Sequence, residues 1–121
     1  HLEAAIAAEH CKAPKYSDTN WQQLLQWYDL LIQIDNSPVI LLNRSLVIHC
    51  MGETEKAIPA ILAIPGIELL INHDPQYSAV LGFLYMKQSD KIKAKDYLQK
   101  ALAITDSKAE KHLLQSRIDQ L

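Results

Sequence analysis

Two His-Cys dipeptides, His10-Cys11 and His49-Cys50, contain the residue types of a zinc site. Two imidazoles and two thiolates are a common zinc ligand set. Adjacent residues of a helix point about 100° apart, however, so neither dipeptide can easily direct both side chains at one ion. The sequence therefore predicts no metal site. We expect Cys50 in the core and His49 as a partly exposed helix residue.

Asn43 and Arg44 are the most conspicuous polar pair, because they interrupt an apolar run between Val39 and Met51. They could hold a carboxylate of a partner. The alternative, which we favour, is structural: Asn43 bonds a neighbouring backbone in the core, and Arg44 pairs with Asp29 or another acid. The other acids and histidines are scattered without a nucleophile–base–acid arrangement, so we predict no catalytic residue, no cofactor and no enzymatic activity.

Charge is distributed unevenly along the 121 residues, whose formal net charge is −2. Residues 1–86 carry four Lys/Arg against nine Asp/Glu, which gives −5, and residues 87–121 carry eight against five, which gives +3. The overall balance favours neither nucleic acid nor a membrane as partner. Two cysteines make no disulfide framework, and no signal peptide or membrane-spanning run is visible, so we expect a reduced, cytoplasmic protein. Because the chain opens without Met and without a helix cap, we also expect it to be a fragment of a longer protein.

Helix-forming residues dominate the elements that must position these side chains. Glycine occurs only three times and about half the residues are apolar, which favours an all-α fold. The run after Ser37 and Pro38 is apolar on nearly every side until Gly52, so the helix at 38–51 should be the central and most buried one. We expect six or seven antiparallel helices in a single domain over 1–121, drawn from patterns at 2–11, 19–35, 38–51, 53–63 (weakened by Pro59), 67–72 (a turn or two), 74–87, 90–104 and 107–121.

An internal period indicates the architecture of the helical array. Counted from Pro75, the positions of the tetratricopeptide pattern are occupied by Ser78, Leu81, Gly82, Tyr85, Ala94 and Leu98, with Ala101 one turn later. Small residues at 82 and 94 would let two antiparallel helices approach closely. An eroded earlier unit starts at Pro38, with small residues at 45 and 57 and Ile61 at its large position. The sequence thus predicts a tetratricopeptide-like array with one clear repeat, one eroded repeat and flanking helices.

The first helix of a tetratricopeptide repeat usually lines a binding groove, which in the clear repeat would present Gln76, Ala79, Phe83 and Met86. Such an apolar groove suits an amphipathic or extended partner segment. We predict that Phe83 and Met86, flanked by Lys87 and Lys91, contact another polypeptide, which requires Phe83 to be partly exposed. In the rival interpretation Phe83 is ordinary core and the lysines form a solvated face. For the eroded repeat we expect its groove helix, 39–50, to be self-buried.

Several motifs, taken in order, resemble one known group of proteins. They are Leu-Glu-Ala-Ala-Ile-Ala-Ala at 2–8, Asp-Thr-x-Trp at 18–21, Tyr-Asp at 28–29, Ser-Pro-Val-x-x-Leu-Asn-Arg at 37–44, Ile-Pro-Gly-Ile-Glu at 64–68 and Leu-Gly-Phe-Leu-Tyr at 81–85. The chain resembles, over essentially its whole length, the tetratricopeptide-like C-terminal extension of extracytoplasmic-function (ECF) RNA polymerase sigma factors. The motifs at 18–21 and 37–44 are the most specific, whereas the motif at 81–85 is generic to tetratricopeptides.

The resemblance implies a regulatory or protein-interaction domain of a promoter-recognition factor. The DNA-binding and polymerase-binding regions of such factors precede this extension, and the chain has neither a basic recognition helix nor helix-turn-helix spacing. Its implied partners are therefore the sigma factor's own core regions or RNA polymerase, without direct DNA binding by this segment. The alternative is a free-standing helical-repeat scaffold that binds a peptide or protein outside transcription.

Overall fold

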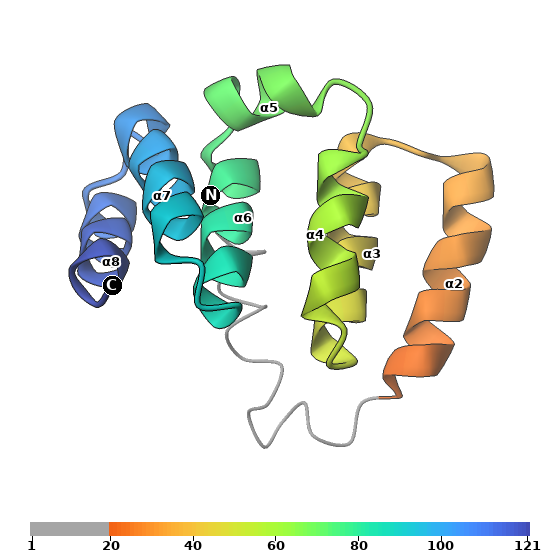
Figure 1. The fold of residues 1–121 in the computed structure, drawn as a ribbon. Helices are drawn as coiled ribbons and strands as arrows, with labels where there is room; N and C mark the ends of the chain where they lie inside the picture. Colours follow the sequence, from red (N-terminus) through yellow and green to blue (C-terminus); the bar gives the residue numbers. More distant parts are fainter. Residues whose placement is uncertain (1–19) are drawn as a thin grey trace. The chain divides into compact units, whose positions relative to one another are not determined.

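The computed structural model of the chain describes residues 20–121, and every regular element in that range is an α-helix. Seven helices are present in the described residues: α2 (Trp21–Ile34), α3 (Pro38–Cys50), α4 (Thr54–Leu62), α5 (Ile67–His73), α6 (Pro75–Lys87), α7 (Lys91–Ile104) and α8 (Lys108–Asp119) (Figure 1). The prediction of an all-α fold is confirmed. The helix predicted at 2–11 and the His10-Cys11 dipeptide lie outside the described residues.

The described chain divides into two compact units, residues 20–65 and residues 66–121. The first contains α2, α3 and α4, and the second contains α5 to α8. The division falls between Pro65 and Gly66, in the link between the helices predicted at 53–63 and 67–72. Gly66 has a positive φ of 78°, a backbone conformation that glycine adopts without strain, and α5 begins immediately after it.

In the 20–65 unit, short connections join α2 to α3 and α3 to α4, and each consecutive pair of helices packs together. Asn20 caps α2, its side chain accepting a hydrogen bond from the Gln23 backbone N–H at 3.1 Å. Ser37, which precedes α3, forms no side-chain cap: α3 starts with Pro38 in its first turn, and the Ser37 backbone N–H donates to the Asp35 carboxylate at 3.0 Å. Gly52, with φ of 85°, follows the end of α3 as the sequence predicted.

In the 66–121 unit, polar residues before three helices cap them as their positions in the sequence suggest. The side chains of Asp74, Asp90 and Ser107 accept hydrogen bonds from backbone N–H groups of the first turns of α6, α7 and α8, at 3.0, 3.1 and 3.3 Å. Pro75 occupies the first turn of α6, where its missing N–H removes no helical hydrogen bond. These caps define the ends of the helices that carry the clear repeat.

The clear repeat is the hairpin of α6 and α7. All of its pattern positions are buried: Ser78, Leu81, Gly82, Tyr85, Ala94, Leu98 and Ala101. At Gly82 the two helices approach so closely that an added Cβ would lie 2.7 Å from Leu98 Cγ and 3.2 Å from the Ala94 carbonyl oxygen. Small side chains at this crossing are therefore required by the packing. The eroded unit behaves similarly, since Ser45, Ala57 and Ile61 are buried in α3 and α4.

The prediction that the helix at 38–51 is the most buried is wrong. Helix α6 contains nine consecutive buried residues, from Tyr77 to Tyr85, whereas α3 contains five. Within its unit α6 packs against α5 and α7, and Arg117 of α8 also covers its Phe83 ring, whereas α3 packs against α2 and α4. Leu42 and Leu46 of α3 are nevertheless core residues, as expected.

Candidate interaction surfaces

Phe83 does not lie on an open surface. Only 2% of the residue is exposed, and its ring is flanked by Lys87, whose Nζ lies 5.2 Å from the ring centroid, and by Arg117 of α8 at 5.0 Å. Both distances suit cation–π interactions. The prediction that a partly exposed Phe83 contacts a partner is therefore wrong for this structure. Burial of Tyr77 to Tyr85 makes most of the expected groove helix part of the core.

The remaining residues of the predicted groove do not form one site. Met86 is half-buried at the end of α6, and the exposed side chains of Lys87 and Lys91 lie on either side of the short turn into α7. Gln76 is half-buried ten residues earlier on the same helix, about 15 Å away along its axis. We call Met86, Lys87 and Lys91 the basic corner; Gln76 is not part of it.

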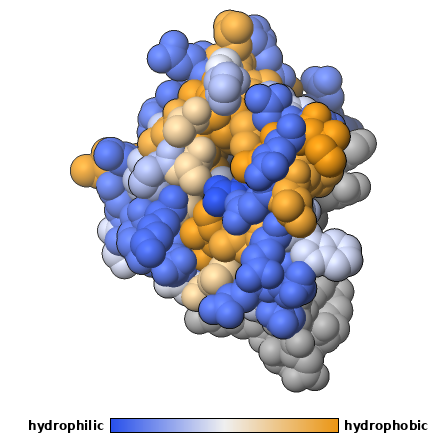
Figure 2. All heavy atoms as spheres, turned by 90° about the vertical axis from the view of Figure 1, so that its right-hand side faces the viewer, coloured by the Kyte–Doolittle hydropathy of each residue, from blue (hydrophilic) through white to orange (hydrophobic). Residues whose placement is uncertain are grey.

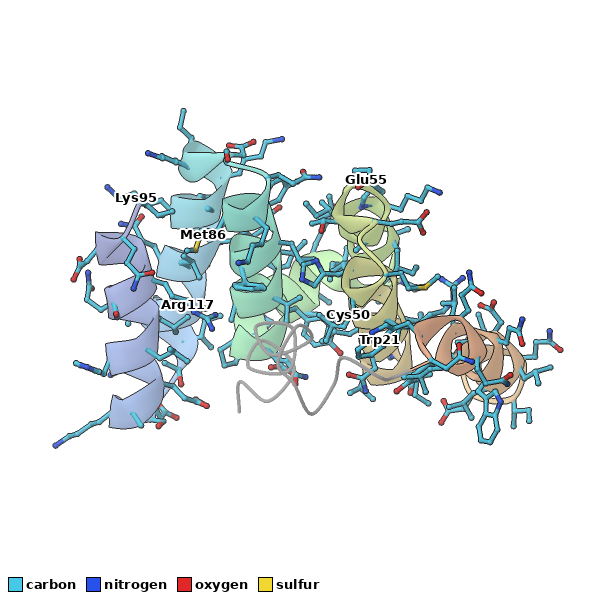
Figure 3. The ribbon with its side chains drawn as sticks, turned by 90° about the horizontal axis from the view of Figure 1, so that it is seen from below. Trp21, Cys50, Glu55, Met86, Lys95 and Arg117 are labelled. Carbon is cyan, nitrogen blue, oxygen red and sulfur yellow. The ribbon has the colours of Figure 1, made fainter. Side chains whose placement is uncertain are left out.

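Lysines of the 66–121 unit also cover aromatic rings. Lys93 lies 5.3 Å from the centroid of Tyr85, which stacks on Tyr97 with 5.6 Å between centroids, and Lys100 lies 5.3 Å from the Tyr97 centroid. Burial raises the pKa of Tyr97, with smaller contributions from Tyr85 and Asp96, so this phenol stays neutral at physiological pH. Lys95 is exposed on α7. Figure 3 labels Lys95 together with Met86 of α6 and Arg117 of α8, which belong to the same unit. These contacts favour a structural role for much of the basic charge, with exposed amino groups at the surface.

The polar pair inside the apolar run has a structural partner. Arg44 Nε donates to Asp29 Oδ1 at 2.6 Å, joining α3 to α2 within their unit. The predicted pairing with Asp29 is confirmed, and because both side chains are partly exposed its contribution to stability should be about 1 kcal/mol or less. Asn43 is half-buried, and its side chain has no hydrogen bond to the described part of the chain, so the expected backbone bond is not found there.

His49 and Cys50 are both half-buried at the end of α3. His49 Nδ1 lies 2.8 Å from the Thr54 hydroxyl at the start of α4, a contact that links the ends of two packed helices. Among residues 20–121, no group of three or more His, Cys, Asp or Glu side chains has the arrangement of a metal site.

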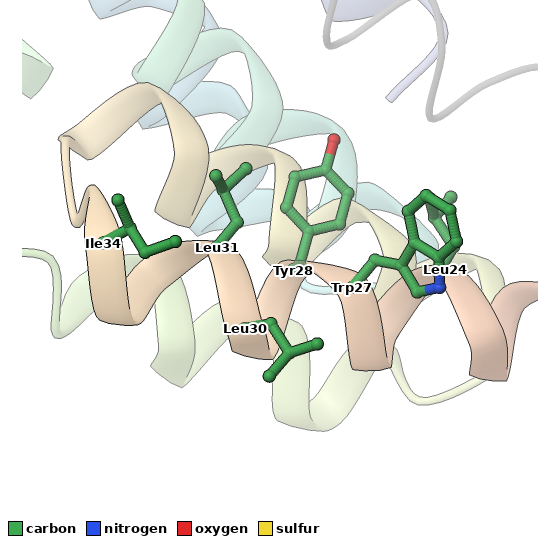
Figure 4. Close-up of a pocket in the computed structure, with 6 residues that line it drawn as sticks. All are labelled: Leu24, Trp27, Tyr28, Leu30, Leu31 and Ile34. Atoms are coloured by element: carbon green, nitrogen blue, oxygen red, sulfur yellow. The ribbon is translucent and has the colours of Figure 1, made fainter.

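The largest concentration of uncovered apolar side chains lies on α2. Trp27, Leu30, Leu31 and Ile34 are 65%, 64%, 40% and 87% exposed. Together with Leu24 and Tyr28 they line a shallow groove of about 430 Å³, and all six residues come from this one helix (Figure 4). We call Leu24, Trp27, Leu30, Leu31 and Ile34 the α2 face. A concentration of this kind marks an interaction site more often than scattered apolar residues do.

The α2 face points away from α3. Asp29, which contacts Arg44 of α3, lies roughly on the opposite side of the helix from Trp27 and Leu31, because each residue turns the helix by about 100°. No residue of α2 is fully buried. Figure 2 looks onto the side of the molecule where α2 lies and shows apolar side chains at the surface between hydrophilic ones. In the sequence, apolar residues from Trp21 to Ile32 recur at spacings of three and four, which is typical of a helix with one buried face. Trp27 and Leu30 lie beyond the face that α3 can cover, and this excess width is the signal of an exposed apolar surface.

Comparison with known proteins identifies one distant relative. An uncharacterized protein of Rhizobium meliloti (strain 1021) is 26% identical over 120 residues, which cover 99% of this chain and 28% of the relative. The chain thus spans less than a third of the length of the relative that it matches. No family profile matches the chain, and no solved structure matches it. In the described residues, no helix combines the length and apolar character needed to cross a membrane.

Proposed function

We propose that the chain is the C-terminal protein-interaction domain of an ECF-type RNA polymerase sigma factor, which acts in the cytoplasm and modulates transcription initiation. The resemblance of the motifs at 18–21 and 37–44 supports the link to sigma factors. Two surfaces fit a protein-contact role: the basic corner, where Lys87 and Lys91 are exposed beside the half-buried Met86, and the α2 face, where four large apolar side chains are exposed on one helix. A similarity that spans only 28% of a longer relative is compatible with a domain of a larger protein.

In this proposal the domain contacts the sigma factor's own core regions or RNA polymerase. The basic corner is a suitable surface for such a partner, because Lys87 and Lys91 are exposed beside the half-buried Met86. Charged residues at an interface rim mainly steer association and set its salt dependence. An acidic patch on the partner would complement these lysines.

Direct recognition of a promoter by this domain is not expected. The chain carries a formal charge of −2 and places much of its basic charge against aromatic rings. We predict that a mobility-shift assay at physiological salt will detect nothing tighter than weak, non-specific binding, with affinities in the range of roughly 10⁻⁴ to 10⁻⁶ M. A nanomolar complex with one promoter sequence would contradict this expectation.

The interaction role is testable in the longer protein. Lys87→Glu combined with Lys91→Glu should change promoter-directed transcription by core polymerase several-fold, since reversing two exposed charges repels an acidic partner surface. Loss of the contact between Lys87 and the Phe83 ring should cost the fold only about 1 kcal/mol. The matched control reverses Lys108 and Lys111, two exposed lysines at the start of α8. Run-off transcription measures the effect, and circular dichroism confirms that each variant is folded. Equal transcription from the folded corner variant, its control and the wild type would exclude the basic corner as the contact surface.

A further inference from the structure

The apolar residues of α2 have a spacing that reads the same in both directions. Leu24, Trp27, Leu31 and Ile34 are separated by three, four and three residues. This is the spacing of a coiled-coil seam, which places the four side chains in one line along the helix. Leu30 widens the line on one side, and its exposed fraction of 64% shows that no other part of the described chain covers it.

We propose that the α2 face binds the α2 face of a second copy of this chain, in an antiparallel, two-fold symmetric pair. A symmetric dimer requires a self-complementary patch. When two α2 helices run in opposite directions, the reversible spacing places Trp27 against Leu31 of the second copy and Leu24 against its Ile34. Every apolar side chain of the seam then meets an apolar side chain, and a large ring meets a smaller residue.

Electrostatics favours this occupant. The residues that flank the seam are Gln23, Tyr28, Leu30 and Asp35, so two copies would face each other with almost no like-charge repulsion. Asp35 is the C-cap of α2, and in the antiparallel arrangement it would lie beside the first turn of the second copy's α2. The first turn of a helix carries partial positive charge, which stabilises a carboxylate. A different protein recognised by electrostatic complementarity would instead require charged residues around the rim of the α2 face.

The dimer should be weak. Five side chains are few compared with the roughly 20–30 residues that each partner contributes to a standard interface, so we expect a dissociation constant above about 1 μM. The inference rests on the protein-contact role proposed for the α2 face and names the partner of that face. The contact with the sigma factor's core regions or with RNA polymerase is assigned to the basic corner.

Sedimentation velocity of the 121-residue chain over a micromolar to near-millimolar series tests the inference. We expect the wild-type sedimentation coefficient to rise with concentration from the monomer towards the dimer value. Trp27→Glu should abolish this rise, whereas Ile92→Glu, at a position 86% exposed on α7, should retain it. Circular dichroism and thermal melts establish that the three proteins are equally folded.

A mixing experiment tests the antiparallel register. A mixture of Trp27→Glu chains and Leu31→Lys chains should regain dimers, since the antiparallel register places position 27 of each copy against position 31 of the other, which pairs Glu with Lys and Leu31 with Trp27. A wild-type chain that stays monomeric at every concentration would overturn the proposal, as would a dimer that survives Trp27→Glu. If the chain is monomeric while the basic-corner variants still change transcription, self-association fails and the proposed function stands.

Discussion

Replacing Phe83 with serine should destabilise the 66–121 unit by about 3–5 kcal/mol, the usual cost of truncating a buried phenylalanine. Phe83 is 2% exposed, so the substitution leaves a cavity between α6 and the Arg117 side chain of α8. It also removes the ring under the amino group of Lys87. A loss of this size corresponds to a fall in melting temperature on the order of 10–20 °C for a chain of this length.

The control for this experiment is Ile92→Ser, which removes an apolar side chain of similar hydrophobicity from a position that is 86% exposed. Its melting temperature should stay within a few degrees of wild type, because an exposed side chain gains little from burial. If the melting temperature of Phe83→Ser equals that of wild type, Phe83 is not a core residue. The groove predicted from the sequence would then again be the candidate partner-binding surface.

Gly82→Val should cost about 2–3 kcal/mol, because the hairpin of α6 and α7 has no space for the added side chain. A Cβ at position 82 would lie 2.7 and 2.8 Å from two carbons of Leu98 and 3.2 Å from a backbone oxygen of α7. Leu98 is fully buried and cannot turn into solvent, so the helices must separate. The matched control is Ala103→Val on the exposed side of α7, which should lose only about 0.5 kcal/mol through helix propensity.

A double-mutant cycle with Leu98→Ala identifies the contact responsible. Leu98→Ala alone should cost about 2–5 kcal/mol. Combined with Gly82→Val it should cost less than the sum of the two, by about 0.5–3 kcal/mol, because the valine methyl groups occupy space that the leucine vacates. Urea denaturation measures all four proteins. Strict additivity would show that the clash at Gly82 is with something other than Leu98.

The helical hairpin was predictable because its signals are local and agree with one another. Gly82 and Ala94 are small residues at the close approach of α6 and α7, and Asp74, Asp90 and Ser107 are strong caps at the correct distance from apolar runs. The pairing of Arg44 with Asp29 was predictable for a similar reason, since a cation in an apolar helix needs an acid on the adjacent helix.

Two features were not predictable from spacing alone. Whether Phe83 is exposed depends on Arg117, which lies 34 positions later on another helix, and periodicity does not reveal such a contact. The exposure of the α2 face could not be predicted either. Trp27 and Leu30 make the apolar stripe of this helix wider than the surface that neighbouring helices cover, and a helix buries only the residues that its neighbours reach. In both cases tertiary packing determined exposure.

The central claim is that this domain belongs to a sigma factor, and the reading frame upstream of His1 tests it most directly. Determination of that coding sequence should reveal, in frame and ahead of the motifs at 2–8 and 18–21, a polymerase-binding region followed by a helix-turn-helix region. An upstream frame that encodes neither region, or a different class of domain, would contradict the account and favour a helical-repeat scaffold outside transcription.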